Sequence, residues 1–93
     1  MNKRHCHAVI TALEYSIQFA PEFDSVEVRH KLFKIVWYGR IFPFSVPETR
    51  RALQYLEQNP QWDISRFLPQ PHSNELLRRV FSELKGTLSK LPI

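Results

Sequence analysis

Glycine is scarce in this sequence, with two residues among 93. β-Sandwiches and β-barrels need many tight turns, and glycine is the residue that most readily adopts the backbone conformations of such turns. The scarcity therefore argues against these folds and favours helices. P-loops and dinucleotide-binding loops are built around closely spaced glycines, so the sequence also excludes both of these phosphate-binding motifs.

Cysteine is almost absent as well. The one cysteine, Cys6, cannot form a disulfide within the chain, so no disulfide framework stabilises the fold. Its neighbours His5 and His7 are metal-binding residue types, but three adjacent residues cannot easily point at one ion. No Cys-x-x-Cys or His-x-x-x-His pair follows them. We therefore expect no metal site and no cofactor.

Long apolar runs are also missing. No stretch approaches the roughly 20 apolar residues that a membrane span needs. Near the N-terminus, Glu14 and Gln18 interrupt the apolar segment that would follow the charged pair Lys3-Arg4 in a signal peptide. We expect a cytoplasmic protein without a membrane partner.

The sequence contains no motif of covalent catalysis. A serine or cysteine nucleophile needs a positioned histidine and a third orienting group, and no Gly-x-Ser-x-Gly elbow occurs. Cys6 lies close to the chain end, where such geometry is hard to hold. Several carboxylates are explained by predicted helix starts, where the helix dipole favours negative charge; these are Asp24, Glu27, Glu48 and Glu75. We predict that the protein is not an enzyme and assign no catalytic residue.

Seven prolines divide the chain into segments whose apolar spacing is mostly helical. The predicted helices cover about 3–19, 25–38, 45–58 and 73–90. The segment 61–68 is too apolar for a free loop, and we expect a turn or two of helix packed on the core. The expected fold is all-α, a compact bundle of about four helices in a single domain of residues 1–93.

Two helix boundaries carry clear local signals. The third helix begins with Ser45-x-x-Glu48 and has Pro47 in its first turn, which is typical of a capped N-terminus. Gly39 follows the second helix and is suited to the left-handed conformation that often ends a helix. The same region leaves an alternative open, because β-branched and aromatic residues are common there. A hairpin turning near Gly39 would give a short β element within residues 33–46.

Basic residues occur in clusters on the predicted helices. The formal net charge is +4, and a basic surplus favours anionic partners. The clusters are Lys3-Arg4, residues 29–34, Arg50-Arg51 and Arg78-Arg79. They are either separate solvated helix faces or a composite patch for phosphate or an acidic protein surface.

An aromatic run extends from Trp37 to Phe44. It contains four aromatic side chains in eight residues, which exceeds what a connector between helices needs; they are Trp37, Tyr38, Phe42 and Phe44. The run either fills the core of a small domain or presents part of itself as an exposed anchor for a partner protein.

Residues 44–56 resemble the recognition helix of bacterial helix-turn-helix and winged-helix regulators. The matching positions are Phe44, Ser45, Pro47, Arg50, Ala52, Leu53 and Leu56. The resemblance implies that Ser45 caps the helix, and that a face containing Val46, Glu48, Thr49 and Arg50 approaches DNA. Pro43 stands where that family usually has glycine, and Thr49 where it usually has valine.

Two functions follow from these features. The first is a small regulatory DNA-binding protein that uses the helix 45–58; its predicted contacts are Arg50, Arg51, Arg40 and Thr49, with Arg29 and Lys31 on phosphates. The second is a protein-binding adaptor or inhibitor, of the compact kind found in mobile elements or secretion systems. It would hold an acidic partner surface with the basic helix faces and the aromatic residues Trp37, Tyr38, Phe42 and Phe44, or these aromatic residues would form a homodimer seam. Exposure of the aromatic side chains discriminates between the two functions.

Overall fold

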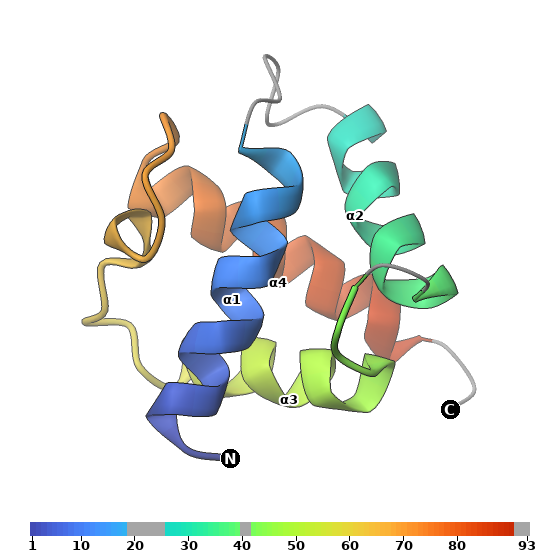
Figure 1. Cartoon of the computed structure of the whole chain (residues 1–93), viewed down its shortest axis with the longest axis horizontal. Coiled ribbons are helices and arrows are strands. Elements are labelled where there is room, and N and C mark those ends of the chain that lie inside the picture. The colour runs from blue at the N-terminus through green and yellow to red at the C-terminus, as the bar shows by residue number, and fades with distance from the viewer. Residues whose placement is uncertain (19–25, 40–41, 91–93) are drawn as a thin grey trace.

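The structure is a computed structural model that describes residues 1–18, 26–39 and 42–90; of Val26 and Glu27 only the backbone is described. These residues form four α-helices and one short 3-10 helix. The elements are α1 (Lys3–Ile17), α2 (Val26–Tyr38), α3 (Val46–Glu57), η1 (Ile64–Arg66) and α4 (Asn74–Ser89). The predicted all-α fold with about four helices is confirmed (Figure 1).

Side-chain caps set where three of the helices begin. The backbone N–H of His5 donates to Oδ1 of Asn2 at 2.8 Å, and the hydroxyl of Ser73 accepts from the N–H of Leu76 at 3.2 Å. At α3 both bonds of the capping box form: the Glu48 N–H donates to Oγ of Ser45, and the Ser45 N–H donates to Oε1 of Glu48. The predicted starts of α3 and α4 are thus confirmed.

The alternative of a β element in residues 33–46 is wrong for the part of that segment that the structure describes. Residues 33–38 form the last turns of α2, and residues 42–45 form no strand. The reason is the spacing of Val28, Leu32 and Val36, which places all three on one buried side of a helix. Burial of that stripe outweighs the weak β propensity of individual residues. Gly39 ends the helix with φ of +59°, as its position predicted.

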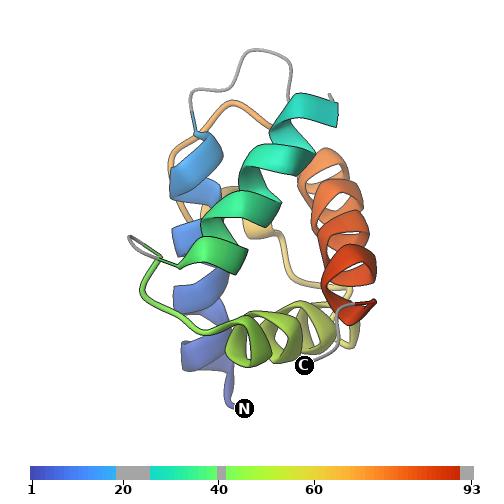
Figure 2. The same ribbon diagram turned by 90° about the vertical axis from the view of Figure 1, so that its right-hand side faces the viewer.

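The helices enclose one core. In Figure 1, α1 crosses in front of α4 while α3 runs along the bottom, and Figure 2 shows α2 beside α4. The contacts between α1 and α3 are the most extensive, and α2 touches α3 only slightly. All four helices contribute fully buried side chains, among them Ile10, Leu32, Leu53 and Phe81.

The connector between α3 and α4 is packed as the sequence predicted. Ile64 of η1 is fully buried, and Oδ1 of Asp63 accepts from the backbone N–H of Ser65 to cap this short helix. The indole of Trp62 lies against the ring of Tyr55, with 5.6 Å between ring centroids. The connector therefore closes one end of the core instead of forming a free loop.

Candidate partner-binding groove

Helix α3 presents less of the predicted DNA-contacting surface than its sequence indicated. Thr49 is fully buried, and its hydroxyl donates to the carbonyl of Ser45 at 2.9 Å. It precedes Ala52 and Leu53 by three and four residues, so it belongs to the buried stripe of the helix. The prediction that Thr49 contacts nucleic acid is therefore wrong.

The two arginines of α3 have different environments. Arg50 is half-buried, and one of its terminal nitrogens, Nη1, lies 3.5 Å from the carbonyl oxygen of Leu88 at the end of α4. Arg51 is exposed, and its only described bond runs from Nε to the Pro47 carbonyl at 3.4 Å. Arg40, also predicted as a contact, lies outside the described residues.

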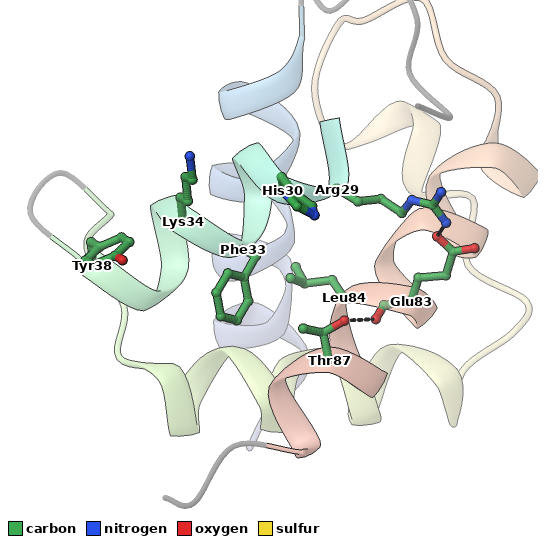
Figure 3. A pocket seen from close by; sticks show the side chains of 8 residues that line it. All are labelled: Arg29, His30, Phe33, Lys34, Tyr38, Glu83, Leu84 and Thr87. Atoms are coloured by element: carbon green, nitrogen blue, oxygen red, sulfur yellow. Dashed lines mark hydrogen bonds and ion pairs between the residues drawn. The ribbon is translucent and has the colours of Figure 1, made fainter. Parts of the chain in front are cut away.

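The basic residues of α2 do not form one patch. Arg29 points toward α4 and pairs with Glu83 at 2.5 Å, on the edge of a cavity of about 360 Å³ between these helices (Figure 3). Lys31 is exposed. Residues two apart in a helix project about 200° from each other, so Lys31 points away from the Arg29 side. The ion pair with Glu83 neutralises much of the positive charge that Arg29 would offer to a phosphate.

The aromatic run is divided between core and surface. Phe42 is buried and Phe44 is half-buried, whereas Trp37 and Tyr38 are 38% and 72% exposed. The indole of Trp37 stacks on Phe33, with 6.1 Å between centroids and 9° between planes. The run therefore contributes Phe42 to the core and leaves Trp37 and Tyr38 exposed.

An open groove of about 840 Å³ runs along α1. Its lining is His7, Ala8, Thr11, Ala12, Tyr15 and Ser16 of α1, Ile35 of α2, and Phe42, Pro43 and Phe44 of the connector. No carboxylate, lysine or arginine is among these residues. Phe42 and Phe44 were predicted partner contacts, but the α1 residues were not. Small residues on the outer face of a helix resemble an ordinary solvated surface in the sequence, so nothing there indicated a site.

The α1 side of the groove, which we call its floor, consists mainly of small side chains whose hydroxyls are already bonded. Ser16 donates to the carbonyl of Ala12 at 3.0 Å, and Oγ1 of Thr11 lies 3.4 Å from Nδ1 of His7. Because these polar groups are satisfied within α1, an apolar surface can cover this part of the floor without leaving the hydroxyl of Thr11 or Ser16 unpaired. The small side chains of the floor also allow a close approach.

The connector side, which we call the wall, is held in place by packing. Phe42 and Phe44 meet edge to face, with 5.8 Å between centroids, and Phe44 also lies 5.7 Å from the ring of His5. Nε2 of His5 is 3.1 Å from Oε2 of Glu48. The pKa of Glu48 is lowered, chiefly because the Ser45 backbone N–H donates to its carboxylate and less because of His5. The wall is therefore tied to the start of α3.

The adjacent residues His5, Cys6 and His7 point in three directions. His5 contacts Glu48, and the ring of His7 packs on Phe67 with 4.1 Å between centroids. The Cys6 thiol is buried and donates to the Ala52 carbonyl at 3.4 Å; burial raises its pKa to about 11. The thiol stays protonated at neutral pH and is positioned as part of the core.

Two exposed cations flank the groove. Arg4 precedes Ala8 by one turn of α1, and Lys31 precedes Ile35 by one turn of α2. Since α1 and α2 run in opposite directions side by side (Figure 1), Arg4 lies toward one end of the groove and Lys31 toward the other. Neither forms an ion pair with a residue that the structure describes. The groove is thus apolar along its length and basic at its ends.

Within the described ranges, no helix is long and apolar enough to cross a membrane. In the same ranges, no three histidine, cysteine or acidic side chains are grouped in a way that could hold a metal ion. Comparison of the chain with protein-family models, curated proteins and solved structures finds no match.

Proposed function

We propose that this chain is a protein-binding module and that its partner docks in the groove along α1 with an acidic surface. The observation that carries this proposal is the groove itself, an open apolar surface with an aromatic wall and a cation at each end. Apolar surface of this kind on a small domain is typical of an interaction site. Aromatic side chains are also enriched among the residues that dominate binding energy at protein interfaces.

The charges of the described residues favour a protein partner over nucleic acid. Binding to a duplex requires several cations that converge on phosphates. Arg29 pairs with Glu83, and Arg50 bonds to the end of α4. Of the two arginines on α3, Arg51 is the exposed one. An apolar groove suits side chains better than phosphates. The lining residues that the structure describes include no carboxylate or thiol, and the proposal is for binding.

The test is a tryptophan substitution that fills the groove. Ala8 is exposed on the floor of the groove, so Ala8→Trp blocks the floor without entering the core. Gln54→Trp, on the exposed face of α3, is the matched control. Each variant and the parent chain are used to capture partners from a lysate of the source organism, with and without nuclease. Circular dichroism and thermal unfolding confirm that all three chains fold alike.

The proposal predicts that the parent chain and Gln54→Trp capture the same protein after nuclease treatment, and that Ala8→Trp loses it by at least about tenfold. Two results would overturn the proposal. One is capture that nuclease abolishes, which would indicate nucleic acid. The other is a protein lost with Gln54→Trp but kept with Ala8→Trp, which would place the binding face on α3.

A further inference from the structure

We infer that the element seated in the groove is an amphipathic α-helix of about three turns, contributed by the partner and carrying an acidic residue near each end. This inference rests on the proposed function and adds the conformation and charge pattern of the partner.

The length and shape of the floor fit a helix. Arg4, Ala8 and Tyr15 are exposed and Thr11 is half-buried along one stripe of α1, and the 11 steps from Arg4 to Tyr15 span about 16 Å at 1.5 Å per residue. That distance equals about three turns of a second helix. Between Arg4 and Tyr15 the floor has the small side chains of Ala8, Thr11 and Ala12. The axes of two packed helices approach most closely where the side chains between them are small.

The aromatic wall supplies the contact for an apolar stripe. Phe44 and Pro43 stand beside the floor, and Ile35 continues the apolar surface along α2. A helix with apolar residues at positions i, i+3 or i+4 and i+7 would place one side chain per turn against this wall. An added β-strand is the main alternative for peptide binding, but it needs an exposed strand edge, and the described residues form no strand.

The ends of the groove set the charge of the occupant. Arg4 and Lys31 are exposed at opposite ends, and the described lining between them contains no acidic residue. A helix with Asp or Glu near each terminus would meet a cation at both ends. A second copy of this chain suits the groove less well, because a symmetric pair would bring the same basic ends together. The charge pattern therefore favours a different, acidic protein.

The experiment is a selection from a displayed library of random 16-residue peptides. The parent chain is the bait, and peptides that also bind Ala8→Trp are removed. We expect the enriched peptides to share an apolar stripe of helical spacing with acidic residues toward both ends. A synthetic version should gain helical circular dichroism on binding, and a proline at its centre should lower its affinity by about tenfold or more.

Charge reversal tests the ends of the groove. We expect Arg4→Glu and Lys31→Glu each to weaken binding of the selected peptide by about fivefold. Replacing the acidic residue of the peptide that faces the changed position with lysine should restore the affinity. Arg51→Glu makes the same change of net charge on α3 and is expected to leave binding unchanged. The affinity for the acidic peptide should also fall by about fivefold as salt rises from about 0.05 to 0.5 M.

The outcomes separate this inference from the proposed function. If the library yields no peptide that is lost with Ala8→Trp, both the groove and the helix are wrong. A different outcome is that peptides bind the groove but are proline-rich or extended, or bind equally well after charge reversal. That result would disprove the inference of an acidic helix and would leave the proposed protein-binding groove supported. Concentration-dependent dimerisation that Ala8→Trp abolishes would identify a second copy as the occupant and overturn the inference of an acidic partner.

Discussion

The Glu14→Gln variant is expected to be more stable than the parent chain by about 3 kcal/mol near pH 8, and to lose most of this advantage near pH 4. Glu14 lies within α1, its side chain is fully buried, and neither carboxylate oxygen has a hydrogen-bond partner among the residues that the structure describes. Burial raises its pKa from 4.5 to about 8. Ionised Glu14 is therefore much less favourable in the folded chain than in water.

The direction of the pH dependence follows from proton binding. Below about pH 4.5 both states of the chain keep the proton on Glu14, so its ionisation costs no stability. Between that value and about pH 8 the unfolded chain releases the proton and the folded chain retains it, so the free energy of unfolding falls as pH rises. Above pH 8 both states are ionised and the loss is complete.

Urea unfolding of both chains near pH 4, 6 and 8 measures this difference. Every other group titrates in both chains, so the gap between their curves isolates Glu14. Glu75→Gln, at an exposed position in α4, is the control and should change stability by less than about 1 kcal/mol at each pH. If the free energy of unfolding changed with pH in the same way for Glu14→Gln and the parent chain, Glu14 would not be a buried carboxyl without a hydrogen-bond partner.

Replacing Arg78 with methionine is expected to lower the free energy of unfolding by about 3 kcal/mol. Its guanidinium donates to three backbone carbonyls, those of Leu56 at 3.3 Å, Asn59 at 2.9 Å and Trp62 at 2.8 Å. These carbonyls belong to the last turn of α3 and to the chain that leaves it. Two of them also accept a backbone N–H, that of Asn59 on Leu56 and that of Trp62 on Asn59, so Arg78 adds a further donor at each. Arg78 thus ties the end of α3 to α4.

Lysine at the same position gives a graded test. Its single ammonium cannot reproduce the planar fork of donors, so Arg78→Lys should lose about half as much stability as Arg78→Met. Arg66 is the control, since its side chain is 86% exposed and pairs only with Asp63 at 3.4 Å; Arg66→Met should cost less than about 0.5 kcal/mol. Equal losses at positions 66 and 78 would disprove the bridging role. Thermal or urea unfolding provides the values.

Local signals explain why the helices could be predicted. The capping box at Ser45 and Glu48 and the positive φ of Gly39 depend only on neighbouring residues, and both are in place. The β-rich composition of residues 26–46 left a β element open as an alternative, because composition reports a preference and not burial. The helical spacing of Val28, Leu32 and Val36 was visible in the sequence, and the structure adds that all three side chains are buried.

The roles of the charged residues depended on tertiary contacts. Arg78 appeared in the sequence as one member of a basic pair, yet it bonds to carbonyls 16 to 22 residues away. Arg29 forms an ion pair with Glu83, which is 54 residues away in the sequence. Thr49 was assigned to a DNA-facing surface by its resemblance to a recognition helix, whereas α1 and α4 pack on that helix and bury it. Spacing along one helix cannot identify the side that its neighbours cover.

The wall of the groove could be predicted from the sequence, whereas the floor could not. The aromatic run indicated Phe42 and Phe44, because so many aromatic residues exceed what a connector needs. The floor was not foreseen, since Ala8, Ala12 and Ser16 carry no chemical signal until the fold sets them beside those rings.

Chemical-shift mapping tests the groove most directly. The ¹⁵N-labelled chain is titrated with the captured partner or the selected peptide, and amide shifts are followed residue by residue. The groove predicts the largest changes at Ala8, Thr11, Ala12 and Ile35, with α3 little affected. Changes centred on Arg51 and Gln54, with α1 unmoved, would contradict it.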